Sequence, residues 1–140
     1  MTNSELLVQA GKTYQFKQHK GGPGVRCFRG SKPHKFLQQM ALRQAKYQAK
    51  YITQGHQNWD DRFEECRRHL PAGFMVAENA AESWPENSRI EAATEMFYCW
   101  ERSPGHWGLC QHKGAAYYGI NMSKGRNGVY YATLLVAWKQ

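Results

Sequence analysis

The stretch WERSPGHWGLC, residues 100–110, places a Ser-Pro-Gly-His sequence between two tryptophans. Proline and glycine interrupt helices, so we expect a helix over residues 88–102 to end here. Two overlapping capping boxes precede it, Ser83–Glu86 and Ser88–Glu91. The apolar face expected for this helix consists of Ile90, Ala93, Phe97 and Trp100. His106 follows the interruption, where it is either a polar residue of an aromatic core or a functional side chain.

An earlier helix is predicted from about residue 33 to residue 54. Pro33 suits a first helical turn, and Gly55 ends the pattern. The apolar residues that recur at three- and four-residue steps are Phe36, Leu37, Met40, Ala41, Ala45, Ala49 and Ile52. The polar segment that follows is expected to be a loop with a short helix over residues 62–69.

The C-terminal part is typical of β-structure. Residues 115–122 and 129–138 are rich in Tyr, Val, Leu and Thr, and the polar residues 123–128 between them have the composition of a hairpin loop. Some extended structure is also expected near Val76. The element order is therefore helix, loop, helix, strand, strand, which indicates an α+β fold.

Length and composition favour one domain. The chain has 140 residues, of which 41% are hydrophobic and 14% aromatic, enough for a packed core. No run has the length of a membrane span, and the N-terminus lacks the pattern of a secretory signal. The cysteines form no CxxC pair, so two disulfides or four buried free thiols remain open, and the lack of a signal peptide favours thiols. They are Cys27, Cys66, Cys99 and Cys110.

Positive charge gathers in the first third of the chain. The net charge is +8, and residues 1–54 hold ten Lys and Arg against the single acid Glu5. We therefore divide the chain into a basic, glycine-rich N-terminal arm over residues 1–32 and a domain over residues 33–140. The expected basic surface consists of Lys12, Lys17, Lys20, Arg26, Arg29, Lys32 and Lys35. Such a surface suits an anionic surface or an acidic protein partner.

Three short motifs carry side chains that could share a cleft. They are GHQNW with His56, AENAA with Glu78, and SPGH with His106, each expected at a helix end or in a loop. Taken singly, a histidine at a helix end is more often a hydrogen-bonded structural residue, and Glu78 could cap a backbone group. The expected neighbours of this cleft are Asn79, Ser103 and Glu101.

Together and in this order, the motifs resemble the CAP superfamily of cysteine-rich secretory, antigen 5 and pathogenesis-related proteins, also known by their SCP-like domain. The match includes the small residues Ala45 and Ala49 before His56, then AENAA, Trp100 and SPGH, with the two strands after them. The Ser-Pro-Gly-His turn is that of a bacterial-type variant. The family's first helix has no counterpart in the sequence, where the basic arm takes its place.

The resemblance implies a CAP-like α-β-α sandwich with a central antiparallel sheet and a cleft lined by His56, Glu78 and His106. Two imidazoles and a carboxylate can bind a divalent metal such as zinc, with the carboxylate as ligand or as orienter of a ligand. It also implies an extracellular or virion-associated protein, whereas without export the chain would be cytoplasmic.

Three functions fit the sequence. The first is a non-enzymatic binding module, of the lipid-binding or metal-binding kind known in this family, that acts at a cell envelope or anionic surface. The second is a structural subunit of a larger assembly, such as a viral particle or a secretion device. The third is a metal-dependent hydrolase with Glu78 as general base. We do not expect nucleic acid as a partner, because that role rests on charge alone.

Overall fold

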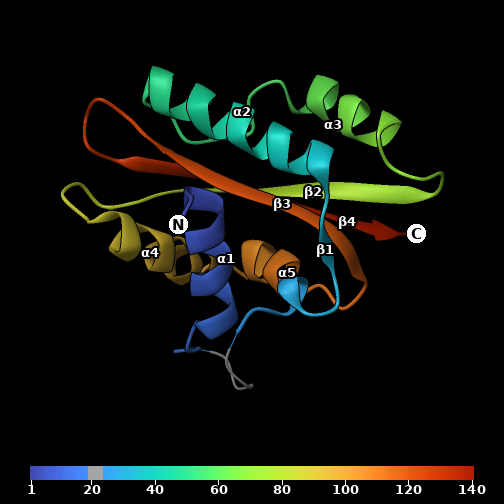
Figure 1. The fold of residues 1–140 in the computed structure, drawn as a ribbon, viewed down its shortest axis with the longest axis horizontal. Coiled ribbons are helices and arrows are strands. Elements are labelled where there is room, and N and C mark those ends of the chain that lie inside the picture. Colours follow the sequence, from blue (N-terminus) through green and yellow to red (C-terminus); the bar gives the residue numbers. More distant parts are fainter. Residues whose placement is uncertain (19–23) are drawn as a thin grey trace.

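The computed structural model describes residues 1–18 and 24–140 and shows a three-layer α+β fold (Figure 1). Helices α2 and α3 cover one face of a sheet, while α1, α4 and α5 cover the other. The helices are α1 (Asn3–Thr13), α2 (Lys35–Tyr51), α3 (Trp59–Arg68), α4 (Arg89–Glu101) and α5 (Pro104–Cys110), with the 3-10 helix η1 (Arg26–Phe28). The strands are β1 (Lys32–Pro33), β2 (Phe74–Glu82), β3 (Ala115–Lys124) and β4 (Tyr130–Lys139).

The sheet has the order β1-β3-β4-β2. Strand β4 lies between β3 and β2 and is antiparallel to both, as the expected central antiparallel sheet requires. The short strand β1 adds a parallel edge beside β3 through Lys32 and Pro33, which makes the whole sheet mixed. The hairpin predicted between the last two strands is confirmed.

Side chains of β4 alternate between two hydrophobic cores, as the two-residue period of a strand dictates. Leu134 and Val136 join the core beneath α1, α4 and α5, which also holds Phe97 and Trp100. Leu135 and Ala137 face the other way and pack beneath α2 and α3, with Leu37, Met40 and Val76. Residues 130–137 of β4 are all buried, because β4 lies between the two other long strands and is covered by helices on both faces.

Helix α2 begins two residues later than expected. Pro33 belongs to β1, and the ring Nδ1 of His34 caps the helix by accepting from the backbone N–H groups of Phe36 at 3.2 Å and Leu37 at 3.4 Å. The helix approaches β3 so closely that a Cβ at Gly119 would lie 2.2 Å from the Leu37 carbonyl oxygen. Glycine at position 119 is therefore required by helix–sheet contact.

Helix α4 matches the prediction, with Ser88 and Glu91 forming its capping box. Three details differ. Ser83 and Glu86 form no capping box, because the Ser83 hydroxyl accepts instead from the Tyr130 backbone N–H at 2.9 Å. Ile90 lies outside the core with 66% of its surface exposed. The Ser-Pro-Gly-His sequence forms the first turn of α5, with Pro104 in the N-terminal turn where its missing N–H costs nothing.

The N-terminal segment differs most from the prediction. Residues 3–13 form helix α1, which packs against α4 and buries Leu7 completely, so the expected irregular arm begins with a helix. Thr2 and Glu5 form its capping box. All four cysteines are free thiols, with Cys99 partly exposed and the others buried. Among the described helices, none is long and apolar enough to cross a lipid bilayer.

Candidate functional site

Glu78 lies in the middle of β2, opposite Leu135 of β4, and not in a loop or at a helix end as expected. It stands two residues after Val76, so both side chains point to the face covered by α2 and α3. The side chain of Glu78 is only 1% exposed. A carboxylate buried to this degree needs partners for its charge.

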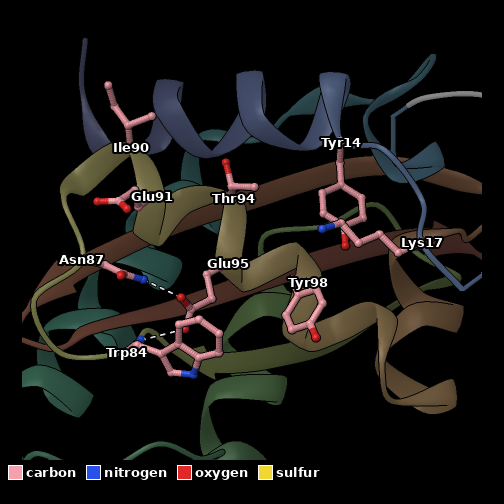
Figure 2. Close-up of a pocket in the computed structure, with 9 residues that line it drawn as sticks. All are labelled: Tyr14, Lys17, Trp84, Asn87, Ile90, Glu91, Thr94, Glu95 and Tyr98. Atoms are coloured by element: carbon pink, nitrogen blue, oxygen red, sulfur yellow. Dashed lines mark hydrogen bonds between the residues drawn. The ribbon is translucent and has the colours of Figure 1, made fainter.

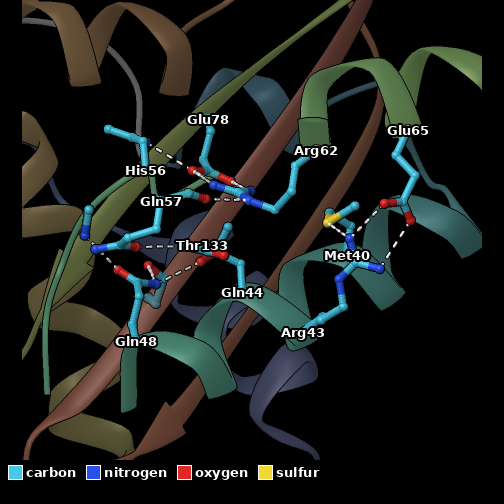
Figure 3. A network of polar contacts seen from close by, with 12 residues as sticks. Met40, Arg43, Gln44, Gln48, His56, Gln57, Arg62, Glu65, Glu78 and Thr133 are labelled. Carbon is cyan, nitrogen blue, oxygen red and sulfur yellow. Dashed lines mark hydrogen bonds and ion pairs between the residues drawn. The ribbon is translucent and has the colours of Figure 1, made fainter. Parts of the chain in front are cut away.

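Arg62 of α3 supplies that partner, and the sequence analysis did not single it out. Its Nη2 lies 2.9 Å from Glu78 Oε1, and its Nη1 donates to Oε2 of the same carboxylate (Figure 3). The Nε of Arg62 donates to the Gln57 carbonyl at 2.9 Å, and the Trp59 ring lies 5.2 Å from the guanidinium carbon. Arg62 is 4% exposed, so this is a buried, two-pronged ion pair.

His56 lies on the loop between α2 and α3 and contacts the same carboxylate. Its Nδ1 is 2.9 Å from Glu78 Oε1, while 46% of its side chain is exposed. Beside it, Gln44 donates to the Gln57 side chain at 2.8 Å, and Gln48 donates to the Thr133 hydroxyl at 2.9 Å (Figure 3). These hydrogen bonds join α2, the loop and the sheet into one polar network.

His106 lies in the first turn of α5, which covers the opposite face of the sheet from α3. Burial lowers the pKa of His106, and the charge of His56 lowers it further. His106 lines a pocket of about 400 Å³ together with Gln54, Ala81, Trp84 and Trp100. His56 lines a different cavity, beside Asn58 and Trp59.

The other expected cleft neighbours have separate roles. Asn79 is buried and donates through Nδ2 to the His106 carbonyl at 2.8 Å, which ties α5 to β2. Ser103 precedes α5, and its carbonyl accepts from the Trp107 N–H at 2.8 Å. The Glu101 carboxylate is buried and accepts from the Tyr14 hydroxyl at 2.7 Å and from the Gln18 N–H at 2.7 Å. Glu101 therefore holds the N-terminal segment and does not contribute to the cleft contacts.

The donor set does not fit a divalent metal as it is arranged. No group of three or more His, Cys, Asp or Glu side chains within residues 1–18 and 24–140 could hold a metal ion. Both oxygens of Glu78 already accept from Arg62, and one of them also contacts His56. A zinc ion would need one of these oxygens at about 2.0–2.2 Å, next to a guanidinium of the same charge sign.

The cations expected on the basic surface are exposed wherever the structure describes them. They are Lys12, Lys17, Arg26, Arg29, Lys32 and Lys35, whereas Lys20 lies outside the described residues. Backbone hydrogen bonds of 2.8 Å from Gly24 to Tyr14 and from Val25 to Gly11 join the two described parts of this N-terminal segment to each other.

A third cavity, of about 550 Å³, opens beside α4 and was not predicted from the sequence (Figure 2). The buried Glu95 carboxylate lies at its centre and accepts from the Trp84 N–H at 2.7 Å and from the Asn87 amide. The indole of Trp84 is 61% exposed, and Tyr98 and Lys17 line the other end. The only sequence signal for this cavity is the isolated tryptophan in the polar segment SWPEN.

Comparison with known proteins gives likeness in structure alone. No protein-family model matches the sequence, and no curated protein matches it either. Among solved structures, an outer surface protein from Borrelia burgdorferi matches with a TM-score of 0.62 and 13% identity, over 79% of this chain and 78% of that one. NaASP2, solved with Zn²⁺, matches with a TM-score of 0.52 and 14% identity, over 96% of this chain and 74% of that one.

NaASP2 has the CAP-like fold of an Ancylostoma secreted protein. At 13% and 14% identity, the two likenesses concern the fold. The bacterial-type Ser-Pro-Gly-His variant is not tested by them and stays a prediction. The protein therefore has a CAP-like α+β fold, in which helices cover both faces of a four-stranded sheet.

Proposed function

We propose that this chain is a non-enzymatic, CAP-like binding module that acts at an anionic surface, such as that of a cell envelope, and that its basic N-terminal segment makes the contact. Residues 6–59 contain no Asp or Glu, so the cations of this segment have no acid next to them in the sequence. Anionic lipid attracts each well-placed cation by about 1 kcal/mol near the membrane.

The observation that carries this proposal is the way in which Glu101 holds the segment. Its buried carboxylate accepts from the backbone N–H groups of Lys17 at 2.9 Å and Gln18 at 2.7 Å, and from the Tyr14 hydroxyl at 2.7 Å. The carboxylate thus binds main chain and a tyrosine, and the side chain of Lys17 stays exposed. The residues held in this way present the Lys17 cation without a large ordering cost on binding.

The geometry around Glu78 supports binding over catalysis. A general base must reach the proton of a bound water or substrate with an available oxygen. In this protein, the carboxylate is 1% exposed and both of its oxygens are engaged by Arg62 and His56. The hydrolase considered from the sequence would need this ion pair to break before each turnover.

The test is co-sedimentation of the protein with vesicles of phosphatidylcholine, with and without phosphatidylserine. We expect binding only to the anionic vesicles, weakening as salt rises from about 50 to 200 mM because the attraction is screened. Replacing Lys12, Lys32 and Lys35 together by glutamine should weaken it, since these exposed cations flank the held segment.

The matched control replaces Lys113, Lys124 and Lys139 by glutamine, which removes the same charge from exposed positions elsewhere on the molecule. Equal losses for both triple variants would show that only net charge matters and would overturn the assigned surface. Equal binding to neutral and anionic vesicles would overturn the proposal itself. Absence of vesicle binding together with large self-assemblies in sedimentation would favour the structural subunit instead.

A further inference from the structure

We infer that the guanidinium of Arg62 is the resident cation of the cleft and takes, at Glu78, the place that a divalent metal would otherwise occupy. The cleft would then hold its carboxylate charge-neutral without any metal. This inference concerns α3 and β2 and is independent of the proposed basic contact surface, which lies on the N-terminal segment.

Arg62 is fixed in position by contacts that do not involve Glu78. Its Nε donates to the Gln57 carbonyl at 2.9 Å, and its guanidinium lies over the Trp59 ring at 5.2 Å. Gln57 is itself held by the Gln44 amide at 2.8 Å. The two terminal nitrogens are thereby aimed at the carboxylate, in the fork geometry that matches a carboxylate with two parallel hydrogen bonds.

Charge makes the guanidinium and a metal ion mutually exclusive at this carboxylate. The Arg62–Glu78 pair is buried and neutral as a pair, with side chains 5% and 1% exposed. A dication at the same oxygens would bring uncompensated positive charge into a region that water does not screen, which is unfavourable. His56 would then be left as the neighbouring ligand, fewer than a stable zinc site uses.

The charge of Arg62 therefore determines whether the cleft can bind metal. Removing it would leave Glu78 as a buried carboxylate without a cation, beside His56 at 2.9 Å. An imidazole and a carboxylate are both ligands that zinc accepts. The loss of one guanidinium should thus create metal affinity that the natural sequence lacks.

The experiment is zinc titration of the folded chain in competition with a chromophoric chelator, together with thermal melts with and without zinc. We expect no one-to-one zinc binding by the unchanged protein and an affinity at least about tenfold higher for Arg62→Met, since a nearby like charge is removed. Adding Glu78→Gln to Arg62→Met should abolish the gain. Arg62→Lys keeps the positive charge and should gain nothing.

Arg43→Met is the matched control, because Arg43 forms an exposed ion pair with Glu65 at 3.0 Å between α2 and α3. It should leave zinc binding unchanged. One-to-one zinc binding by the unchanged protein that Glu78→Gln removes would overturn the inference, as would an Arg62→Met variant that folds and gains no affinity. If Arg62→Met folds only when zinc is present, that dependence supports the inference, and failure to fold with zinc as well contradicts it.

Discussion

Replacing Trp100 by alanine should destabilise the protein severely. Trp100 is 1% exposed, its ring lies edge-on to Phe97 at 5.3 Å, and its Nε1 donates to the Ala80 carbonyl at 3.0 Å. Truncating a buried tryptophan to alanine costs about 3–5 kcal/mol. The lost donor also leaves a buried carbonyl without its partner, which places the cost in the upper half of that range. For a domain of this size, we expect the melting temperature to fall by about 10–15 °C.

The assay is urea unfolding followed by far-ultraviolet circular dichroism, because removing a tryptophan changes the fluorescence signal itself. Trp84→Ala is the matched control: its indole is 61% exposed, and its hydrogen bond to Glu95 comes from the backbone, which alanine keeps. The control should change the free energy of unfolding by less than about 0.5 kcal/mol. Equal destabilisation by the two variants would refute the assignment of Trp100 to the core.

Three further predictions follow from buried polar groups. Burial and the charge of His56 lower the pKa of His106, so the unfolded state binds the His106 proton more tightly than the folded state does. The free energy of unfolding should therefore fall as the pH drops below about 6.5. In a pH series of thermal melts, His106→Ala should remove this pH dependence while leaving the fold intact. Burial raises the pKa of the Cys27 thiol to about 12, so iodoacetamide should modify the partly exposed Cys99 before Cys27 in the folded protein. Mass spectrometry of the digested peptides would show the order of labelling. Labelling of Cys27 before Cys99 would contradict the burial of Cys27. Glu101→Gln should lower the free energy of unfolding by about 2 kcal/mol, because hydrogen bonds to a charged acceptor are worth about 1.5–3 kcal/mol each. The same change should speed hydrogen exchange of the backbone amides of residues 17 and 18. Unchanged exchange there would show that other contacts hold the segment.

The sequence predicts the long helix and the hairpin well because their signals are local. The Ser88–Glu91 capping box and the helical spacing up to Trp100 depend only on neighbours along the chain. Ile90 fits the same spacing but is exposed, since it sits at the open start of α4 where no other element covers it fully. Helix α1 was missed although Thr2 and Glu5 carry its capping box, because its few apolar residues suggested no amphipathic face.

The candidate site was predicted only in part. The motifs predict one cleft for His56, Glu78 and His106, and the structure joins the first two by a contact of 2.9 Å. They could not reveal Arg62, because an arginine in a charged helix is ordinarily a surface residue, and only the packing of α3 against β2 buries it. Glu101 was expected near the cleft, yet it faces the N-terminal segment, since which way a helix-end side chain points depends on the neighbouring elements.

The position of β4 in the sheet has a consequence for synthesis on the ribosome. Both β2 and β3 precede it in the sequence, yet each has its long antiparallel partner only in β4. A nascent chain that has not yet reached residue 130 would hold β2 without its partner and β3 paired only with the two-residue β1, and such unpaired edges invite pairing with other chains. The sheet therefore cannot close gradually as the chain emerges, because both of its long strand pairs wait for residues 130–139.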